Sequence, residues 1–251
     1  MAKKKLIKLG SKTAKSGFKN ERDIAKKFNN WKDDKDSQEW LKIMGYKLKE
    51  IEKVKAIVIT GSHKTDVQVQ IAIYLKEAVS IENLSVKLVS NPQGFNQIDK
   101  RWIDKYVEMW GIPSSITKAL KSFTGEIKPK RKGLRDKRRI FFDEMDISTQ
   151  KAIVGFFRKN KILVVSDILK GNDEFLVNWM MVVFKNKNKN PEWILKHINY
   201  VLNIFGGGNV KITDNGSLKI GKITMQRKGG DAGRETSKML QFKINPMELF
   251  K

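Results

Sequence analysis

The first half of the chain alternates between helical and strand patterns of apolar residues. Apolar side chains at helical spacing predict a helix over residues 18–31, and a second, shorter helix is predicted at 37–44. Residues 54–60 form an apolar run typical of a buried strand. Residues 66–75 alternate between apolar and polar positions, as a half-buried strand does, and residues 84–90 are predicted as a third strand.

A basic connector divides the chain in this interpretation. Two helices are predicted before it, at 97–110 and 113–124, and residues 126–139 then carry many Lys and Arg but few core-forming side chains. We place a boundary here, between a domain of residues 1–127 and a domain of residues 128–251. The alternative is a solvated loop within one domain.

The second half mixes helices with a hairpin. Helices are predicted at 148–160 and 162–170, and another starts at Pro191 and ends at the glycines 206–208. Asp214-Asn215-Gly216 is a strong short-range hairpin signal. The strands predicted here cover residues 210–213, 217–227 and 239–244. Together the patterns predict a mixed α/β (α+β) fold, with a central mixed sheet flanked by helices and a second mixed α/β domain.

Composition excludes several classes of protein. The chain has 251 residues, 40% of them hydrophobic, and no cysteine, which rules out disulfides and cysteine-based zinc sites. Two histidines are too few for most histidine metal sites. No stretch approaches the roughly 20 apolar residues of a membrane span. We therefore expect a cytoplasmic protein without a membrane partner.

The net charge points to a polyanion. Lys and Arg number 51 against 27 Asp and Glu, which gives +24. Basic proteins gain affinity for nucleic acid because bound phosphates release condensed counterions. The alternative is lysine enrichment in an AT-rich genome, with which the Lys-Asn run at 185–190 agrees.

Three residues in the first half have the spacing of a metal-dependent phosphodiesterase. Such enzymes need oxygen ligands that hold a hard cation. They also need a nearby positively charged side chain that stabilises the negative charge on the phosphate. Asp66 opens one predicted strand, and Ser85 and Lys87 share one face of the next, with 18 residues between Asp66 and Ser85. In such an arrangement an acidic residue usually occupies the position of Ser85. The backbone carbonyl of Val86 is a further candidate ligand for the metal.

Glu21 is a candidate for the missing charge. It lies on the apolar stripe of the predicted helix 18–31, where an acid is costly unless something binds it. The alternative is a salt bridge at the rim of the core, to Lys19 or Lys87.

Seven collinear segments, spread over nearly the whole chain, carry a family resemblance. They are GSKTAK (10–15), GFKNE (17–21), VKLVSN (86–91), GFNQIDK (94–100), DKRR (136–139), QRKGGD (226–231) and MLQFK (239–243). In these segments the sequence resembles the small monomeric type II restriction endonucleases of the PD-(D/E)XK superfamily that cut GCGC. In that family the middle acidic position is held by Gln, so a neutral residue is tolerated there, and Ser85 is shorter still.

The resemblance implies a mechanism and partners. Asp66 would hold one or two Mg²⁺ ions beside the scissile phosphate in double-stranded DNA. Lys87 would orient the attacking water or stabilise developing charge, and Ser85 would be a direct or water-mediated ligand. The products would carry a 5′-phosphate and a 3′-hydroxyl. A cognate DNA methyltransferase in the same bacterial host would be a functional partner, and the enzyme would be a monomer or weak dimer.

Contacts to DNA are expected from a turn and from the C-terminal region. The resemblance suggests that Phe95 wedges between base pairs, with Gln97 and Lys100 beside it; the alternative is a core role for Phe95 at the start of a helix. Arg and Lys pair with guanine and Asp with cytosine, so base readers are expected near the 226–231 segment, where phosphate contact is the alternative. The candidates are Gln226, Arg227, Lys228, Asp231, Arg234, Gln241 and Lys243.

Two other functions compete with the endonuclease. The neutral Ser85 also fits a DNA- or RNA-binding protein whose nuclease core has lost activity. A nicking or repair nuclease of looser specificity is the third hypothesis.

Overall fold

The computed structural model describes most of the chain. The described residues are 2–59, 69–129, 133–171, 175–185, 190–230 and 234–251, with side chains from residue 15 onward. The chain forms two compact units, each made of separate stretches of sequence. The first comprises Met1–Asn96, Leu169–Val201 and Asn245–Lys251, and the second Gln97–Ile168 and Leu202–Ile244.

The first unit is a mixed five-stranded sheet with the strand order β1-β2-β3-β5-β6. Strands β3 and β5 run parallel, whereas the other neighbours are antiparallel. The strands are β1 (Ile51–Val58), β2 (Val69–Leu75), β3 (Val79–Val89), β5 (Trp179–Phe184) and β6 (Glu192–His197). The helices are α1 (Ala2–Asn29) and α2 (Lys35–Ile43), with the short helices η1 (Leu48–Glu50) and η5 (Pro246–Phe250).

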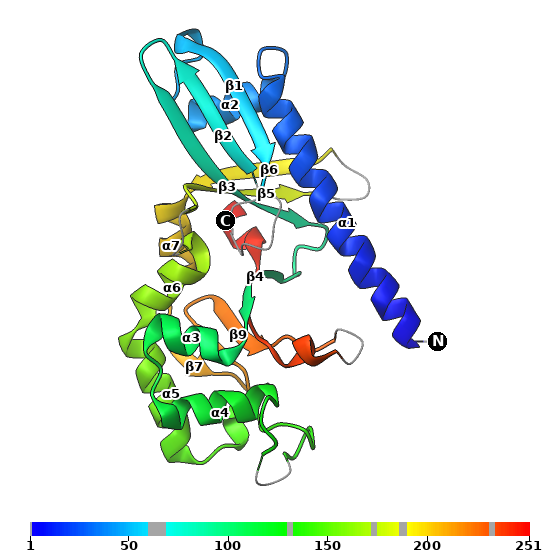
Figure 1. Ribbon diagram of the computed structural model, residues 1–251, viewed down its shortest axis with the longest axis vertical. Coiled ribbons are helices and arrows are strands. Elements are labelled where there is room, and N and C mark those ends of the chain that lie inside the picture. Colours follow the sequence, from blue (N-terminus) through cyan, green and yellow to red (C-terminus); the bar gives the residue numbers. More distant parts are fainter. Residues whose placement is uncertain (1, 60–68, 130–132, 172–174, 186–189, 231–233) are drawn as a thin grey trace. The chain divides into compact units, whose positions relative to one another are not determined.

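Helix α1 runs across β1, β2 and β3 and supplies one side of the core (Figure 1). Its Ile24 and Phe28 are buried, as its helical periodicity predicted, and they pack with the alternate β2 side chains Val69, Ile71 and Ile73. Because these β2 residues are fully buried, the expected half-buried strand is confirmed over its described part. Helix α2 begins after Asp34, which caps it by accepting a hydrogen bond from the Ser37 amide at 2.8 Å.

The last residue of α1 is hydrogen-bonded to the edge of the sheet. Asn29 donates from Nδ2 to the carbonyl of Ala56 at 3.0 Å, and its Oδ1 accepts from the Ala56 amide at 2.8 Å. A single side-chain amide therefore satisfies both backbone groups of one residue of β1, an edge strand of this sheet.

The second unit contains a five-stranded sheet in the order β4-β10-β9-β8-β7. Its strands are β4 (Asn96–Arg101), β7 (Val210–Ile212), β8 (Leu218–Ile220), β9 (Ile223–Arg227) and β10 (Leu240–Ile244). Its helices are α3 (Ile103–Trp110), α4 (Ser114–Thr124), α5 (Ile147–Lys159) and α6 (Lys161–Lys170), whose end belongs to the first unit, and α7 (Ile198–Gly206), whose start does. The short helices are η2 (Phe142–Glu144) and η4 (Glu235–Lys238).

An aromatic cluster joins the sheet of the second unit to its helices. Tyr106 stacks on Trp110 at a centroid distance of 4.8 Å, and both rings contact Phe242 of β10 edge-on. Such pairs add to the apolar burial that holds α3 on the sheet. Among the described residues, no helix has the length and apolar character needed to cross a membrane.

The structure corrects two predicted helices. Residues 97–101 belong to strand β4, and the helix begins only at Ile103. Pairing with β10, distant in sequence, outweighs the local pattern, and the buried Asp99 of β4 accepts a hydrogen bond from the Tyr106 hydroxyl at 2.9 Å. Residues 192–197, predicted to open a helix, form β6, because they pair with β5, a strand that the sequence analysis did not identify.

The boundary predicted at residue 127 does not separate the compact units. Strands β5 and β6 complete the sheet that β1–β3 begin, although they follow that point in the chain. Helices α3 and α4 precede it and belong to the second unit. The expectation of a mixed α/β fold with a mixed sheet flanked by helices is confirmed.

Glu82 joins three segments of the first unit. Its Oε1 accepts a hydrogen bond from the Tyr46 hydroxyl at 2.7 Å, and its Oε2 accepts from Trp179 Nε1 at 2.8 Å. Burial, with the nearby Glu82 carboxylate among the other causes, raises the pKa of Tyr46 to about 12. Glu82 therefore has a structural role on β3.

Removing this acceptor should destabilise the first unit. We expect Glu82→Ala to cost about 1–3 kcal/mol for each donor left without a partner, measured by urea unfolding. Glu82→Gln keeps a carbonyl oxygen in place and should cost clearly less. Equal losses for the two variants would show that the hydrogen bonds contribute nothing measurable.

Candidate active site and nucleic-acid interface

Ser85 and Lys87 are buried side by side on one strand. They stand two residues apart on β3, and their exposed fractions are 1% and 6%. The parallel partner β5 holds this stretch in register, with Ser85 opposite Met180 and Lys87 opposite Val182. A cation withdrawn from water to this degree is costly unless charges or hydrogen bonds compensate it. Lys87 is therefore not a solvated lysine, and its burial makes it a candidate functional residue.

Glu21 of α1 lies within electrostatic reach of Lys87. Burial raises the pKa of the Glu21 carboxyl above its usual range, while Lys87 and then Arg22 lower it. Burial has the larger effect, so Lys87 compensates only part of the cost of the Glu21 charge. A cation beside this carboxylate would remove the rest of that cost.

Asn20, which the sequence analysis did not select, is the most buried polar residue among the α1 side chains that the structure describes, from residue 15 onward. It is 3% exposed, and among the described residues its Nδ2 is a buried donor without a hydrogen-bond acceptor. It precedes Glu21 and lies four residues before Ile24, on the face of α1 that packs on the sheet. A polar residue at a helical core position was the signal that would have identified it.

Asp66 and Asp231 lie outside the described residues. Within the described part of the chain, no group of three or more acidic, His or Cys side chains could hold a metal ion. Candidate metal ligands near Lys87 include the Glu21 carboxylate, the Ser85 hydroxyl and the Val86 carbonyl, which all offer oxygen atoms. Oxygen donors of this kind fit a hard cation such as Mg²⁺.

Phe95 is presented on a well-anchored turn between β3 and β4. Its ring is 51% exposed, which argues against the core role considered for it. The turn is fixed by a hydrogen bond from the Gly94 amide to the Asn91 carbonyl at 2.8 Å and by one from Asn96 Nδ2 to the Leu88 carbonyl at 3.0 Å. Gln97 is exposed on β4, while Lys100 is partly buried.

Arg227 is engaged within the protein at the end of β9. Its Nε donates to the Ser237 carbonyl at 3.0 Å, and its Nη1 lies 3.8 Å from Asp136 Oδ2. The neighbouring Gln241, only 2% exposed, donates from Nε2 to the carbonyls of Arg227 and Lys228 at 3.3 Å. Arg227 and Gln241 therefore hold the segment that follows β9, whereas Arg234 is exposed and Gln226, Lys228 and Lys243 are partly buried.

Asp136 is surrounded by arginines, which makes this corner of the second unit cationic. Arg138 donates from Nε to its carboxylate at 2.9 Å, and Arg139 Nε lies 3.5 Å away. These arginines, the hydrogen bonds of Arg138 first, lower the pKa of Asp136. Burial and then the charge of Arg227 lower the pKa of Arg139 to about 10, and its guanidinium lies 3.9 Å from the centre of the Phe141 ring.

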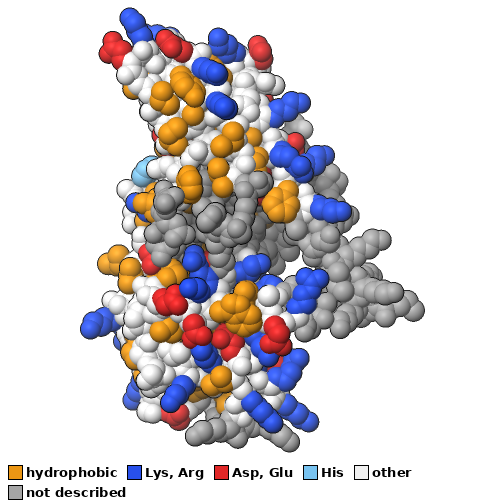
Figure 2. Space-filling view, viewed as in Figure 1, with side chains coloured by type: hydrophobic (Ala, Val, Ile, Leu, Met, Phe, Trp, Pro, Cys, Tyr) orange, Lys and Arg blue, Asp and Glu red, His pale blue; other side chains and the backbone are white. Residues whose placement is uncertain are grey.

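Basic side chains on the face drawn in Figure 2 are not gathered in one patch. Figure 2 shows Lys and Arg distributed over the visible face, with acidic and apolar side chains between them. On this face the excess positive charge of the chain, +24 overall, is dispersed among other side chains.

Comparisons with known proteins identify the family of this chain and a solved structure with a similar fold. The profile of the family described as "R.HinP1I restriction endonuclease" matches residues 44–250. The search of curated proteins found no match. A solved structure of restriction endonuclease MspI in complex with its cognate DNA is similar, with a TM-score of 0.59 and 12% sequence identity over 86% of this chain and 80% of that chain. At this identity the likeness concerns the fold alone, and it agrees with the expected restriction-endonuclease-like architecture.

The Glu21 carboxyl should make stability depend on pH when no metal is present. Because its pKa is raised in the folded state, the folded protein holds this proton more tightly than the unfolded chain does. Its contribution to stability is complete below the unfolded pKa and is lost as the pH rises through the folded one.

We therefore expect Glu21→Gln to gain stability relative to wild type as the pH rises across that window. Urea unfolding in the presence of EDTA at several pH values measures this difference. Glu39→Gln, which removes an exposed carboxylate of α2, is the control and should follow the wild-type profile. A difference between Glu21→Gln and wild type that is constant with pH would contradict the assignment.

Proposed function

Because the chain belongs to the R.HinP1I restriction endonuclease family, we propose that it cleaves double-stranded DNA at a short G+C palindrome, GCGC, as a type II enzyme that uses Mg²⁺. The observation that carries the proposal is the buried Lys87 beside Ser85, within electrostatic reach of the half-buried Glu21, in a chain of this family. Hydrolysis would leave 5′-phosphate and 3′-hydroxyl ends.

The residues near Lys87 have distinct roles in this proposal. The ammonium group of Lys87 stabilises charge on the scissile phosphate and orients the attacking water. Glu21 and Asp66 supply negative oxygens for the metal, and Ser85 and the Val86 carbonyl are neutral donors. When bound, the metal supplies Lewis-acid activation of the phosphate and the water. Burial on β3 fixes Lys87, so little reorganisation is needed at the moment of reaction.

DNA contacts are assigned to the turn and to the β9–β10 region. In this proposal the exposed Phe95 enters the stack of bases from a groove, with Gln97 and Lys100 beside it, and its exposure supports the assignment. Gln226, Arg227, Lys228, Asp231, Arg234, Gln241 and Lys243 are proposed to contact the site. Of these, Arg227 and Gln241 also hold the loop in place, since their donors already have acceptors within the protein.

The proposal includes the setting of the enzyme. Its partner is duplex DNA, and a cognate methyltransferase would protect the same site in a bacterial host. We propose that it acts in the cytoplasm, as a monomer or weak dimer.

A non-catalytic DNA-binding protein is the second candidate function. It is favoured by Ser85, which stands where an acid is usual, and by the lack of an acidic cluster among the described residues. Incubation with unmethylated plasmid, with and without Mg²⁺, separates the two. Discrete fragments that require the metal support the endonuclease, and intact plasmid supports the alternative.

The catalytic assignment can be tested with three variants. We expect Asp66→Ala and Lys87→Ala to bind DNA as wild type does but to lose cleavage by at least about a hundredfold, as is typical when a charge-stabilising group is removed. Lys55→Ala removes an exposed lysine of β1 and should cut normally. Cleavage by Lys87→Ala at nearly the wild-type rate would reject this active site.

A further variant tests base reading. We expect Arg227→Ala to lose about 1–3 kcal/mol of binding on GCGC duplexes for each lost bidentate contact, with a smaller loss on unrelated duplexes. Binding titrations on both duplexes give the comparison. An equal loss on the two would reassign Arg227 to phosphate contact or to loop anchoring through Ser237.

A further inference from the structure

A row of basic side chains crosses the sheet of the second unit. Lys211 of β7 is paired with Lys219 of β8, Lys219 with Thr224 of β9, and Thr224 with Lys243 of β10. Directly paired residues point to the same face, so these four side chains form one line across four strands. We call this set the lysine row. Neighbouring strands lie about 4.8 Å apart, which gives the row a length of about 14 Å.

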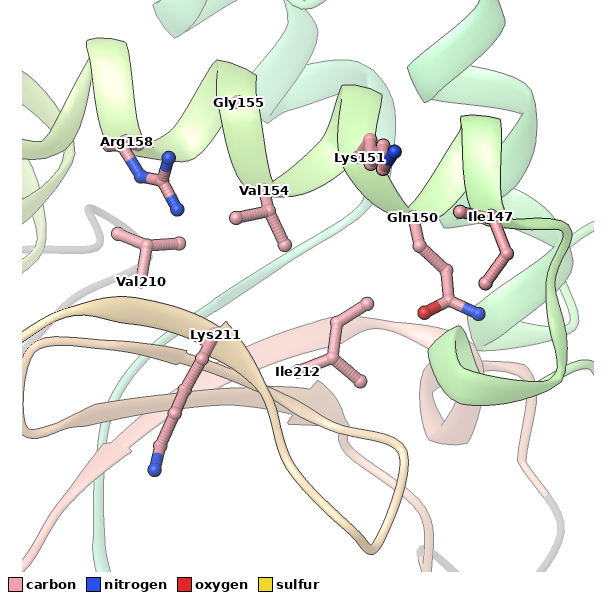
Figure 3. A pocket seen from close by; sticks show the side chains of 9 residues that line it. All are labelled: Ile147, Gln150, Lys151, Val154, Gly155, Arg158, Val210, Lys211 and Ile212. Atoms are coloured by element: carbon pink, nitrogen blue, oxygen red, sulfur yellow. The ribbon is translucent and has the colours of Figure 1, made fainter.

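The row lies on the face of the sheet that is turned away from the apolar core. Its neighbours along the strands, among them Val210, Ile220, Ile223 and Phe242, are buried. Figure 3 shows the same division on β7, where Val210 and Ile212 point toward α5 and Lys211 points away from it. Lys211 is exposed, while Lys219, Thr224 and Lys243 are partly buried.

The row carries uncompensated positive charge. Lys211 and Lys219 stand directly opposite each other, an arrangement that destabilises a sheet. In the part of the chain that the structure describes, no carboxylate forms an ion pair with any of its three ammonium groups. Burial alone lowers the pKa of Lys243. Like charges held together in this way indicate a polyanionic ligand.

We propose that the lysine row binds the phosphate backbone of duplex DNA. Lys243, grouped above with the candidate contacts to the site, is thereby assigned to phosphate contact, the alternative to base reading. This proposal rests on the proposed function. Lysine suits the role because its ammonium group is a compact point charge. It lacks the planar fork of donors with which arginine makes bidentate contacts. A row of about 14 Å matches the axial rise of about four phosphates on one strand. The row holds the duplex in place, and its contacts are independent of sequence.

The test is the salt dependence of binding in EDTA. The triple variant Lys211→Gln/Lys219→Gln/Lys243→Gln removes the charge and keeps long side chains. Its affinity should fall equally on a duplex with GCGC and on one with the site permuted. Each lost phosphate contact lowers the slope of log affinity against log salt by about 0.9, so the advantage of wild type should shrink about 40-fold between about 50 mM and about 200 mM salt.

Three further variants serve as controls and as an independent test of the row. Lys118→Gln/Lys151→Gln/Lys159→Gln removes the same charge from exposed positions on α4 and α5. Its slope of log affinity against log salt should differ from that of wild type by less than the slope of the row variant does. Thr224→Glu places an acid in the middle of the row without removing a lysine. It should weaken binding to both duplexes, whereas Thr224→Gln should not. Thermal unfolding checks that each variant is folded.

The outcomes separate the two proposals. If wild type cuts and binds DNA but the row variants keep its affinity and salt slope, the lysine row is not a DNA surface, and the endonuclease assignment stands. A loss confined to the GCGC duplex would also overturn phosphate binding by the row. If wild type binds neither duplex, both proposals fail.

Discussion

Strand β3 is paired in parallel with β5 over Leu84–Val89, and a parallel neighbour can be reached only through a long crossover. The crossover in this chain contains β4, α3, α4, α5 and α6, so the whole first stretch of the second unit, Gln97–Ile168, lies between the two strands in sequence. The same pairing places Ser85 and Lys87 in the centre of a sheet, with neighbours on both sides. Their burial is thus a consequence of topology, and the chemistry proposed for Lys87 depends on it.

Burying charged groups in the first unit costs free energy, and the described residues offset only part of that cost. Lys87 and Glu21 compensate each other in part, and Asn20 Nδ2 is a buried donor without an acceptor in the described chain. Unsatisfied polar groups destabilise a fold and are concentrated at functional sites. Hydrated metal and phosphate oxygens are the partners that this combination of a carboxylate, an ammonium group and an amide would accept.

Periodicity predicted the elements whose patterns are local. The alternation at Val69–Ile73, the helical stripe through Ile24 and Phe28 and the hairpin at Asp214–Gly216 all specify their structure without distant partners. The errors at 97–101 and 192–197 concern strands whose only partners are distant in sequence or were not predicted. Strand β5 was missed because an apolar run buried on both faces has no period that marks it as a strand.

The candidate site was predictable to a similar extent. Parity along a strand was enough to place Ser85 and Lys87 on one face, and an acid on an apolar stripe was enough to select Glu21. The sequence could not reveal that Arg227 is held by Ser237 or that Arg138 and Arg139 gather around Asp136. These contacts depend on how a loop folds back against a strand, and local pattern carries no information about that.

The amide of Asn29 has a consequence for the protein at high concentration. β1 is an outer strand, and an outer strand offers unpaired N–H and C=O groups to any other extended chain. At Ala56 both groups are already occupied, so a second molecule cannot extend the sheet through the middle of this strand without displacing the end of α1. This basic protein thereby carries, in one side chain, a barrier to self-association through the β1 edge of its first sheet.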